Sequence, residues 1–135
     1  MKAIGTFPAG PFVPTDVVAD PTITTALPVN VATVAKEYQG EITGRSATVF
    51  TSAFDQQAGV GTYIAMESFD GALNGRSGTF NFAHSATIAG SDRSNEFFLI
   101  VPSSGTGDLT GITGTGGMTV AADGTHTVWF DYELP

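Results

Sequence analysis

Residues 69–80 read FDGALNGRSGTF and carry the clearest structural signal in the chain. Asn74-Gly75 is the strongest short hairpin motif, because both central residues of a type I′ turn need a positive φ and Asn-Gly tolerates this cheaply. Thr and Phe on either side favour strands. The stretch therefore predicts two antiparallel strands, over 61–73 and 76–85, that meet at this turn.

A two-residue turn also fixes which residues face one another across the hairpin. On one side of the sheet the predicted register pairs Leu73 with Arg76, Gly71 with Gly78, Phe69 with Phe80, Glu67 with Phe82 and Ala65 with His84. Because this side is rich in aromatic residues, we expect it to face the interior. Glu67 and His84 are then interior diagonal neighbours, with Cα atoms about 7–8 Å apart.

A carboxylate and an imidazole among aromatic rings would be unusual core residues. Burying a charge is costly, so we expect Glu67 either to pair with His84 or to have a raised pKa. Either state suits proton transfer, which makes Glu67 and His84 the candidate catalytic residues. The alternative is that the pair only satisfies itself or a buried water, since structural ion pairs also perturb pKa values.

The rest of the chain indicates further short strands. We expect them at residues 2–7, 29–39, 41–53, 95–101, 108–112, 114–121 and 126–134. No window keeps a helical apolar period without an interrupting Gly or Pro, and 135 residues suit one domain. About eight antiparallel strands close a small barrel and remove its open edges. The predicted fold is all-β, a single eight-stranded antiparallel β-barrel.

Residues 8–28 contain five prolines, a density that excludes pairing as a central strand. The segment also holds Phe12, Val17 and Val18, which is too apolar for an ordinary solvated linker. We expect a proline-rich arm that covers an edge of its own core. The alternatives are a lid on the barrel mouth or a contact with a neighbouring subunit, so a homo-oligomer formed through the arm stays open.

Net charge and cysteine content exclude several classes of partner. The net charge is −8 with five Lys and Arg residues, which argues against a nucleic-acid surface. Cysteine is absent, so disulfides and thiolate chemistry are excluded and a reducing compartment is compatible. Residues 1–7 lack the apolar segment of a signal peptide, and no stretch approaches the roughly 18 apolar residues of a membrane span. We expect a cytoplasmic protein with no membrane partner.

No known catalytic or cofactor-binding motif is complete in the sequence. The glycine-rich run 105–117 is not followed by the helix that a phosphate site requires. A P-loop lysine and a nucleophile elbow are missing. Two histidines with Glu67 match a metal triad only in composition, because nothing in their spacing favours one. We expect no metal and no cofactor.

Four further residues are candidates for the interior or the surface. Lys36 alternates with apolar residues and is a possible interior ammonium, although lysine ends usually reach water and the surface position is favoured. Near the C-terminus the core stripe is Val128, Phe130, Tyr132 and Leu134, with Trp129 and Asp131 on the other face. Asp131 and Glu133 are expected outside, and His126, beside the turn at 123–124, is expected in solvent.

Three segments carry a resemblance to a known family: FDGALNGRSGTFNFAH at 69–84, VPSSGTGDLTGITG at 101–114 and DYEL at 131–134. They resemble a family of small bacterial domains of unknown function, numbered 3224, and the likeness spans most of the chain after Val29. The SGTGDLTG stretch also looks like a strand turn of allene oxide cyclases and plant dirigent proteins, which implies an eight-stranded barrel with an apolar central cavity. The matches place Glu67 and His84 in register with a Glu and a His of the family. The family has no established activity, so the resemblance supports the fold.

Three functions stay open, and with them whether the protein is an enzyme. The first is a barrel that binds a small hydrophobic or aromatic molecule, with Tyr63, Phe69, Phe80, Phe82, Trp129 and Lys36 as the expected ligand-binding residues. The second is a cofactor-independent isomerase, cyclase or lyase in which Glu67, with a raised pKa, moves a proton while His84 orients it. The third is a non-catalytic structural subunit with a filled barrel.

Overall fold

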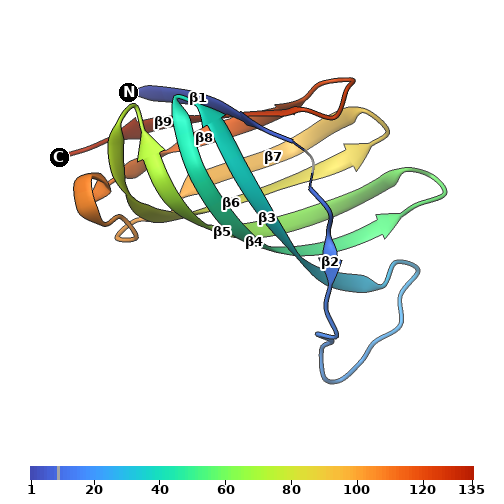
Figure 1. The fold of residues 1–135 in the computed structure, drawn as a ribbon. Helices are drawn as coiled ribbons and strands as arrows, with labels where there is room; N and C mark the ends of the chain where they lie inside the picture. The colour runs from blue at the N-terminus through green and yellow to red at the C-terminus, as the bar shows by residue number, and fades with distance from the viewer. Residues whose placement is uncertain (9) are drawn as a thin grey trace.

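The chain forms a closed antiparallel β-barrel in a computed structural model, which describes residues 1–8 and 10–135. The elements are β1 Lys2–Phe7, β2 Val13–Pro14, β3 Val29–Gly40, β4 Ile42–Asp55, β5 Val60–Leu73, β6 Arg76–Ala89, β7 Asp92–Ile100, the 3-10 turn η1 Gly107–Leu109, β8 Thr113–Val120 and β9 His126–Glu133. Neighbouring strands pair in the order β1-β9-β8-β7-β6-β5-β4-β3, and a β1–β3 pairing closes the barrel (Figure 1). The predicted eight-stranded all-β barrel is confirmed, and β2 is an extra strand on β3.

The turn at Asn74-Gly75 has the predicted chemistry and fixes the predicted register. Its two residues have φ values of 50° and 83°. Every pair expected across the hairpin is observed, from Leu73 with Arg76 to Ala65 with His84. The interior positions of Glu67 and His84 follow from this register, and their exposed fractions are 0% and 4%.

The strand predicted at residues 108–112 is wrong. Residues 107–109 form η1, and Gly107 and Gly111 have φ values of 59° and 80°, which a strand does not sustain. Leu109 and Ile112 are fully buried, so the turn folds inward and seals one end of the barrel. Within the described residues, no helix has the length and apolar character needed to cross a bilayer.

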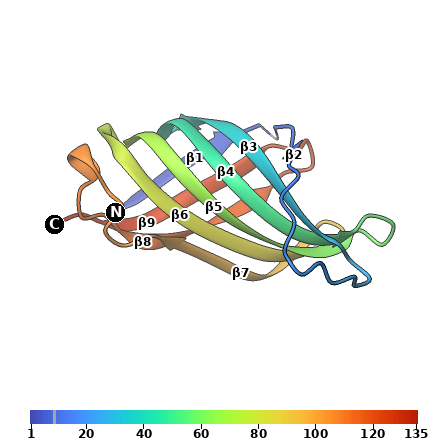
Figure 2. The same ribbon diagram turned by 90° about the horizontal axis from the view of Figure 1, so that it is seen from below.

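The barrel interior has two different halves. Both chain ends, the β5–β6 turn and η1 lie at one end, and the β4–β5, β6–β7 and β8–β9 turns lie at the other (Figures 1 and 2). Near the first end large side chains fill the interior, and we call this part the packed half. Its core includes Ile42, Phe69, Leu73, Phe80, Phe82, Ile100, Leu109, Ile112, Phe130 and Tyr132. The other half, which we call the open half, contains the smaller cluster of Tyr63, Ala65 and Ala86.

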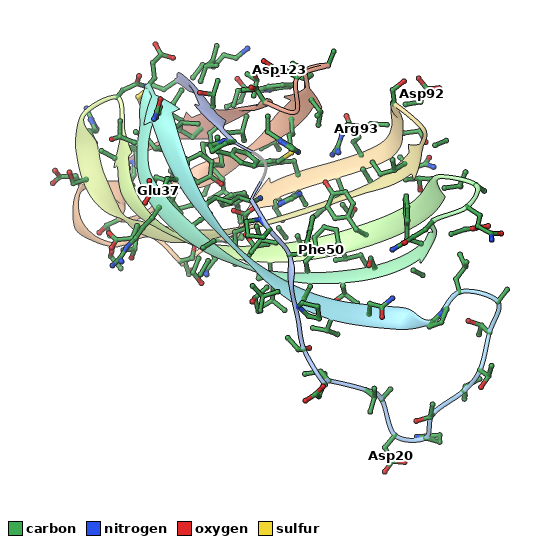
Figure 3. The ribbon with its side chains drawn as sticks, turned by 45° about the vertical axis from the view of Figure 1, so that its right-hand side comes forward. Asp20, Glu37, Phe50, Asp92, Arg93 and Asp123 are labelled. Carbon is green, nitrogen blue, oxygen red and sulfur yellow. The ribbon has the colours of Figure 1, made fainter. Side chains whose placement is uncertain are left out.

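The segment before β3 extends the sheet along the part of β3 that β1 leaves unpaired, beside the open half. Val13 and Pro14 pair with Thr33 and Ala32, as an edge strand can. Phe12 packs against Phe50 with ring centroids 4.9 Å apart. Beyond this contact the chain makes a wide exposed loop around Asp20 (Figure 3). The arm was expected over 8–28, of which residue 9 lies outside the described residues, and its role as a cover or lid stays a prediction.

Strand alternation corrects two predictions in β9. Val128 and Phe130 are fully buried, so Trp129 between them points outward, where its ring lies 5.7 Å from Lys2 Nζ. The face predicted for Trp129, opposite the core stripe, is confirmed, and the expectation that it binds a ligand in the interior is wrong. His126 shares the inward face and stacks on Phe7 at 4.8 Å, half-buried, so the expected solvated position is wrong as well. The exposed positions of Asp131 and Glu133 are confirmed.

Candidate functional site

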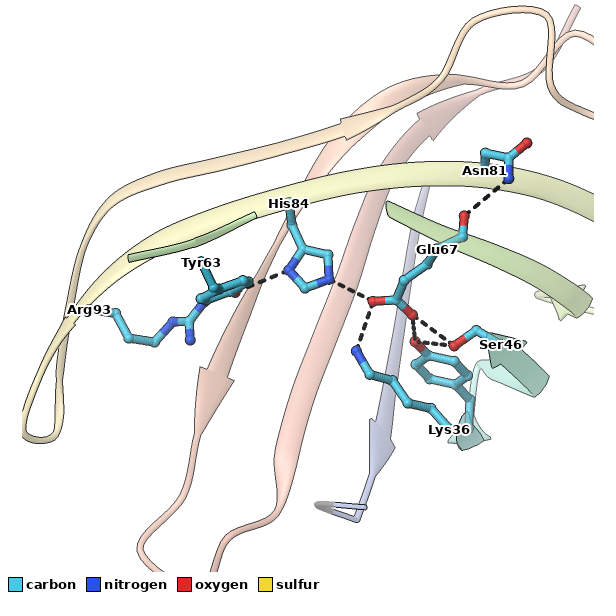
Figure 4. Close-up of polar contacts among 8 residues, drawn as sticks. Lys36, Ser46, Tyr63, Glu67, Asn81, His84 and Arg93 are labelled. Carbon is cyan, nitrogen blue, oxygen red and sulfur yellow. Dashed lines mark hydrogen bonds and ion pairs between the residues drawn. The ribbon is translucent and has the colours of Figure 1, made fainter. Parts of the chain in front are cut away.

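Glu67 is the centre of a buried polar network between the packed and open halves. Its Oε2 lies 2.7 Å from Lys36 Nζ and 2.6 Å from His84 Nε2. Its Oε1 accepts hydrogen bonds from Tyr38 at 2.9 Å and from Ser46 at 2.7 Å (Figure 4). Four donors therefore converge on the two carboxylate oxygens, which is the compensation that a buried charge requires.

The network sets the ionisation state of Glu67. Burial by itself would raise the pKa of this carboxyl group. The hydrogen bonds from His84 and Lys36 and the charge of Lys36 outweigh burial and lower the pKa to about 2. The predicted pairing with His84 is confirmed, the alternative of a raised pKa is wrong, and Glu67 is a carboxylate at neutral pH.

His84 connects this carboxylate to the open half. Its Nδ1 lies 3.0 Å from the Tyr63 hydroxyl, and Arg93 donates to the same hydroxyl at 2.8 Å. Because a carboxylate only accepts, we assign to His84 the tautomer with its proton on Nε2, which donates to Glu67. Nδ1 then accepts from Tyr63, whose oxygen accepts from Arg93. The result is one continuous chain of hydrogen bonds from Arg93 to Glu67.

The Tyr63 phenol stays protonated in this chain. Burial raises its pKa, although the hydrogen bond and charge of Arg93 oppose the change. Arg93 is held in turn by Glu96, whose Oε1 lies 2.8 Å from Arg93 Nε at the partly exposed rim. Tyr63 is thus available as a neutral donor, and any proton that it lost would leave a phenolate beside a guanidinium.

A cavity of about 200 Å³ lies in the open half, next to this network. Its apolar wall is formed by Phe7, Phe12, Val34, Phe50, Ile88 and Met118. Its polar wall is formed by Lys36, Thr48, Tyr63, His84, Arg93 and His126. An apolar cavity of about 150 Å³ is enough to hold benzene, so this one matches a single substituted ring or a short branched chain.

The predicted site residues divide between the two halves. Tyr63 and Lys36 lie in the cavity wall together with His84. Phe69, Phe80 and Phe82, also expected to bind ligand, belong to the packed half. Their register was right, but their rings fill the interior instead of lining a space. The surface position favoured for Lys36 is wrong, because its ammonium has a buried carboxylate partner and the side chain is 8% exposed.

The sequence analysis did not predict four further site residues, although the strand register indicates three of them. The β4–β5 register places Ser46, Thr48 and Phe50 opposite Phe69, Glu67 and Ala65, so all three share the inner face. Extending the hairpin register across the 55–60 turn would have found them. Arg93 pairs with Ile88 just past a bulge in β6, and such a shift is not visible in the sequence.

Comparison with known proteins identifies a family and gives no activity. The family model described as "Protein of unknown function (DUF3224)" matches residues 4–132. A crystal structure of a protein of unknown function from the DUF3224 family of Shewanella oneidensis MR-1 is similar, with a TM-score of 0.84 and 27% identity, covering 100% of this chain and 97% of that chain. No curated protein matches. The activity must therefore be argued from the site.

Proposed function

The chain belongs to the DUF3224 family of proteins of unknown function, and we propose that it binds a small hydrophobic or aromatic molecule in the cavity of its open half. The observation that carries the proposal is a cavity of about 200 Å³ with aromatic and aliphatic walls in a barrel whose other half is solid. Protein interiors are close-packed, whereas the side chains around this cavity leave apolar surface uncovered. A bound molecule would supply the missing contacts.

The walls favour a flat ring as the ligand. Phe50 stacks on Tyr63 with centroids 4.8 Å apart and an interplanar angle of 15°. Phe12 covers Phe50 from the segment before β3. Aromatic walls of this kind offer both stacked and edge contacts to a ligand ring. The polar network behind them satisfies its own groups, so the apolar wall is left to make the contacts with the body of the ligand.

A substitution that fills the cavity with a larger side chain tests this proposal. Toluene and p-cresol are titrated by ligand-observed NMR against the native protein, Ile88→Trp and Ile64→Trp. Ile88 lies in the cavity wall, whereas Ile64 is 63% exposed on the outer face and is the matched control. We expect saturable binding to the native protein and to I64W, and none to I88W. Binding that survives in I88W, or is absent from the native protein, would remove the proposal.

Native mass spectrometry of freshly purified protein complements this test by looking for a molecule that co-purifies. Such a molecule should be displaced from the native protein by p-cresol and should be missing from I88W. Its mass would narrow the ligand class directly.

The hydrogen-bond chain favours a second candidate, a cofactor-independent isomerase, cyclase or lyase. Glu67, His84 and Tyr63 place a carboxylate, an imidazole and a phenol in series, with the last two in the cavity wall. Glu67 is ionised and fully buried, so in this candidate it positions His84 while His84 and Tyr63 exchange protons with the substrate. General acid–base catalysis of this kind contributes about 10² to 10⁴-fold.

Glu67→Gln separates the two candidates once a ligand is identified. Loss of its turnover with retained binding would support the enzyme. Unchanged turnover would end a role for this carboxylate. The third interpretation, a structural subunit, expects a filled barrel, and the cavity argues against it.

We further propose a cytoplasmic location, which the absence of cysteine favours because a reducing compartment gives no use for disulfides. A homo-oligomer formed through the proline-rich segment is also a proposal. Val17, Val18 and Ile23 support it, since they are 60%, 75% and 77% exposed. Light scattering on the full chain and on a truncation beginning at Val29 tests it, and the same number of subunits in both particles would refute it.

A further inference from the structure

The polar wall of the cavity is basic although the chain as a whole is acidic. Two of the five Lys and Arg residues, Lys36 and Arg93, line it, and so do both histidines. None of the 13 Asp and Glu residues is among the described residues that line it.

Both cations keep donors beyond their known partners. Lys36 Nζ has three N–H groups and donates one hydrogen bond to Glu67. Arg93 has five N–H groups and uses two of them, toward Glu96 and Tyr63. Because Glu67 and Glu96 offset much of the charge, the cavity offers hydrogen-bond donors at a modest positive potential. This arrangement suits a single anionic group.

The positive charges of the cavity wall act on His126. Burial lowers the pKa of this imidazole, the Gly124 carbonyl opposes the change, and the positive charges of Lys36 and Arg93 lower the pKa further. These are the groups that act on the ring at the cavity. The imidazole is therefore a reporter of charge that enters the cavity.

Thr48 is the second, independent observation. Its side chain lies in the cavity wall and its exposed fraction is 2%. Its Oγ1 has no hydrogen-bond partner among the described residues. Buried hydroxyl groups without a partner are rare in folded proteins, and each one requires an explanation. A ligand with a polar end beside this side chain would supply the partner when rotation about χ1 turns the hydroxyl toward the cavity.

The register places this hydroxyl close to an ammonium group. Thr48 pairs with Val34 across the β3–β4 ladder, and Lys36 is two residues further along the same face of β3. Thr48 and Lys36 are therefore diagonal neighbours on the inner surface, a spacing that long side chains bridge. Together they form a donor corner at the inner end of an apolar cavity.

We propose that the cavity binds small organic monocarboxylates, with the carboxylate at the Thr48–Lys36 corner and the apolar body against Phe12, Phe50 and Ile88. The inference rests on the binding function proposed above and names its ligand class. The Thr48 hydroxyl and the ammonium donate to the carboxylate. Arg93 contributes positive potential from the opposite wall.

Matched acids and amides test the ligand class. Benzoate and phenylacetate are titrated calorimetrically beside benzamide and phenylacetamide, which have the same shape and no charge. We expect the two carboxylates to bind at least about tenfold more tightly, as a charge-assisted hydrogen bond predicts. Carboxylates that bind no more tightly than their amides would overturn the inference.

Thr48→Val tests the corner because it replaces the hydroxyl with a methyl group of similar size. We expect benzoate to bind about tenfold more weakly to T48V, with toluene binding unchanged. Thr43→Val, on the exposed face of the same strand, is the control and should change neither. Equal losses for benzoate and toluene would show that Thr48 only shapes the cavity, and would overturn the role given to its hydroxyl.

Arg93→Gln and Arg45→Gln test the positive potential. Arg45 is 79% exposed in an outer pair with Asp70, so it is the matched control. R93Q should weaken benzoate about threefold to tenfold and R45Q should have no effect. In the native protein, saturating benzoate should raise the NMR-measured pKa of His126, and toluene should not.

Different results would refute the proposed binding function and the proposed ligand class. If toluene binds in the cavity and benzoate binds no better than benzamide, the proposed binding function stands and the carboxylate ligand class is refuted. Absence of binding by every probe removes both. A pKa of His126 that is the same with and without saturating benzoate would also overturn the placement of the anion in this cavity.

Discussion

The packed and open halves of the barrel are built from the same strands and differ in the size of their inward side chains. In β5 the inner face has Leu73 and Phe69 toward the packed end, whereas toward the open end Tyr63 lies between the small residues Ala65 and Gly61. An eight-stranded barrel is just wide enough for large side chains to fill. Small residues at alternate positions therefore create the cavity without any change in the backbone.

The Glu67 network forms the boundary between the two halves. Tyr38 and Phe69 meet edge to face on its packed side, with centroids 5.7 Å apart, whereas His84 and Tyr63 continue it into the open half. A polar network with every member satisfied is rigid and specifies one arrangement. The difference between the halves thus separates stability from the proposed binding: the packed half holds the barrel together, and the open half contains the cavity.

The largest expected difference between the halves is in the cost of losing an aromatic ring. Phe82 is fully buried against Phe98 and Phe130, with centroids 5.3 and 5.1 Å away. Phe82→Ala should lower the free energy of unfolding by about 3–5 kcal/mol, because it opens a new void. Phe50→Ala, at the existing cavity, should lower it by about 1–2 kcal/mol. Urea denaturation at constant pH measures both.

Equal losses in F82A and F50A would contradict this division, because they would mean that the open half is as well packed as the other. Toluene at saturating concentration provides a second comparison. It should stabilise the native protein and not F50A, whose aromatic wall is incomplete.

The next largest effect is expected at the boundary itself. Lys36→Met removes one partner of a buried ion pair, which leaves Glu67 with less compensation. The free energy of unfolding should fall by about 3 kcal/mol, the lower end for such pairs, because His84, Tyr38 and Ser46 remain as donors. In a Glu67→Gln background the same substitution should cost much less, since a neutral amide needs no cation. A double-mutant cycle measures this coupling, and additive losses would show that the pair is not coupled.

The sequence was sufficient to predict the Glu67–His84 pair at the boundary and not the two halves. Asn74-Gly75 acts through local backbone chemistry, so the register of β5 and β6 and the burial of Glu67 and His84 could be derived by counting. Which half is filled depends on side chains that arrive from remote segments, such as Leu109 and Phe130. Glycines with positive φ around η1 turn that segment inward, and a strand pattern does not reveal this.

The polar residues show the same limit. Lys36 pairs with Glu67, which is 31 positions away in the sequence. A surface position is favoured for a lysine, and only this partner explains why Lys36 is buried. Arg93 reaches Tyr63 through a bulge that changes the β6–β7 register. Trp129 was misplaced for a different reason, because its aromatic character was weighted above the alternation of β9 that puts Val128 and Phe130 inside.

A pH titration should distinguish the boundary from the surface. The folded pKa of Glu67 is lowered to about 2 from an ordinary value of 4.5, so its contribution is fully present above pH 4.5 and is lost as the pH falls toward 2. This contribution should be roughly 2–3 kcal/mol in urea denaturation across that range. Glu67→Gln should remove it. Asp123→Asn, at an exposed turn of the open end, should leave most of the pH dependence in place, and a flat native profile would contradict the ion pairing.

The smallest effect should have the opposite sign. Thr48→Val removes a buried hydroxyl that has no partner among the described residues and keeps the shape of the side chain. The free energy of unfolding of the unliganded protein should therefore rise by about 1 kcal/mol, because an unpaired polar group no longer has to be desolvated. A control at Thr62, whose hydroxyl lies 2.9 Å from that of Thr87, should lose stability or stay unchanged on the same substitution. A gain in stability would show that the unpaired hydroxyl weakens the unliganded barrel, as expected of a group that serves the binding of a carboxylate. A loss of stability in T48V would instead mean that the hydroxyl already has a structural partner.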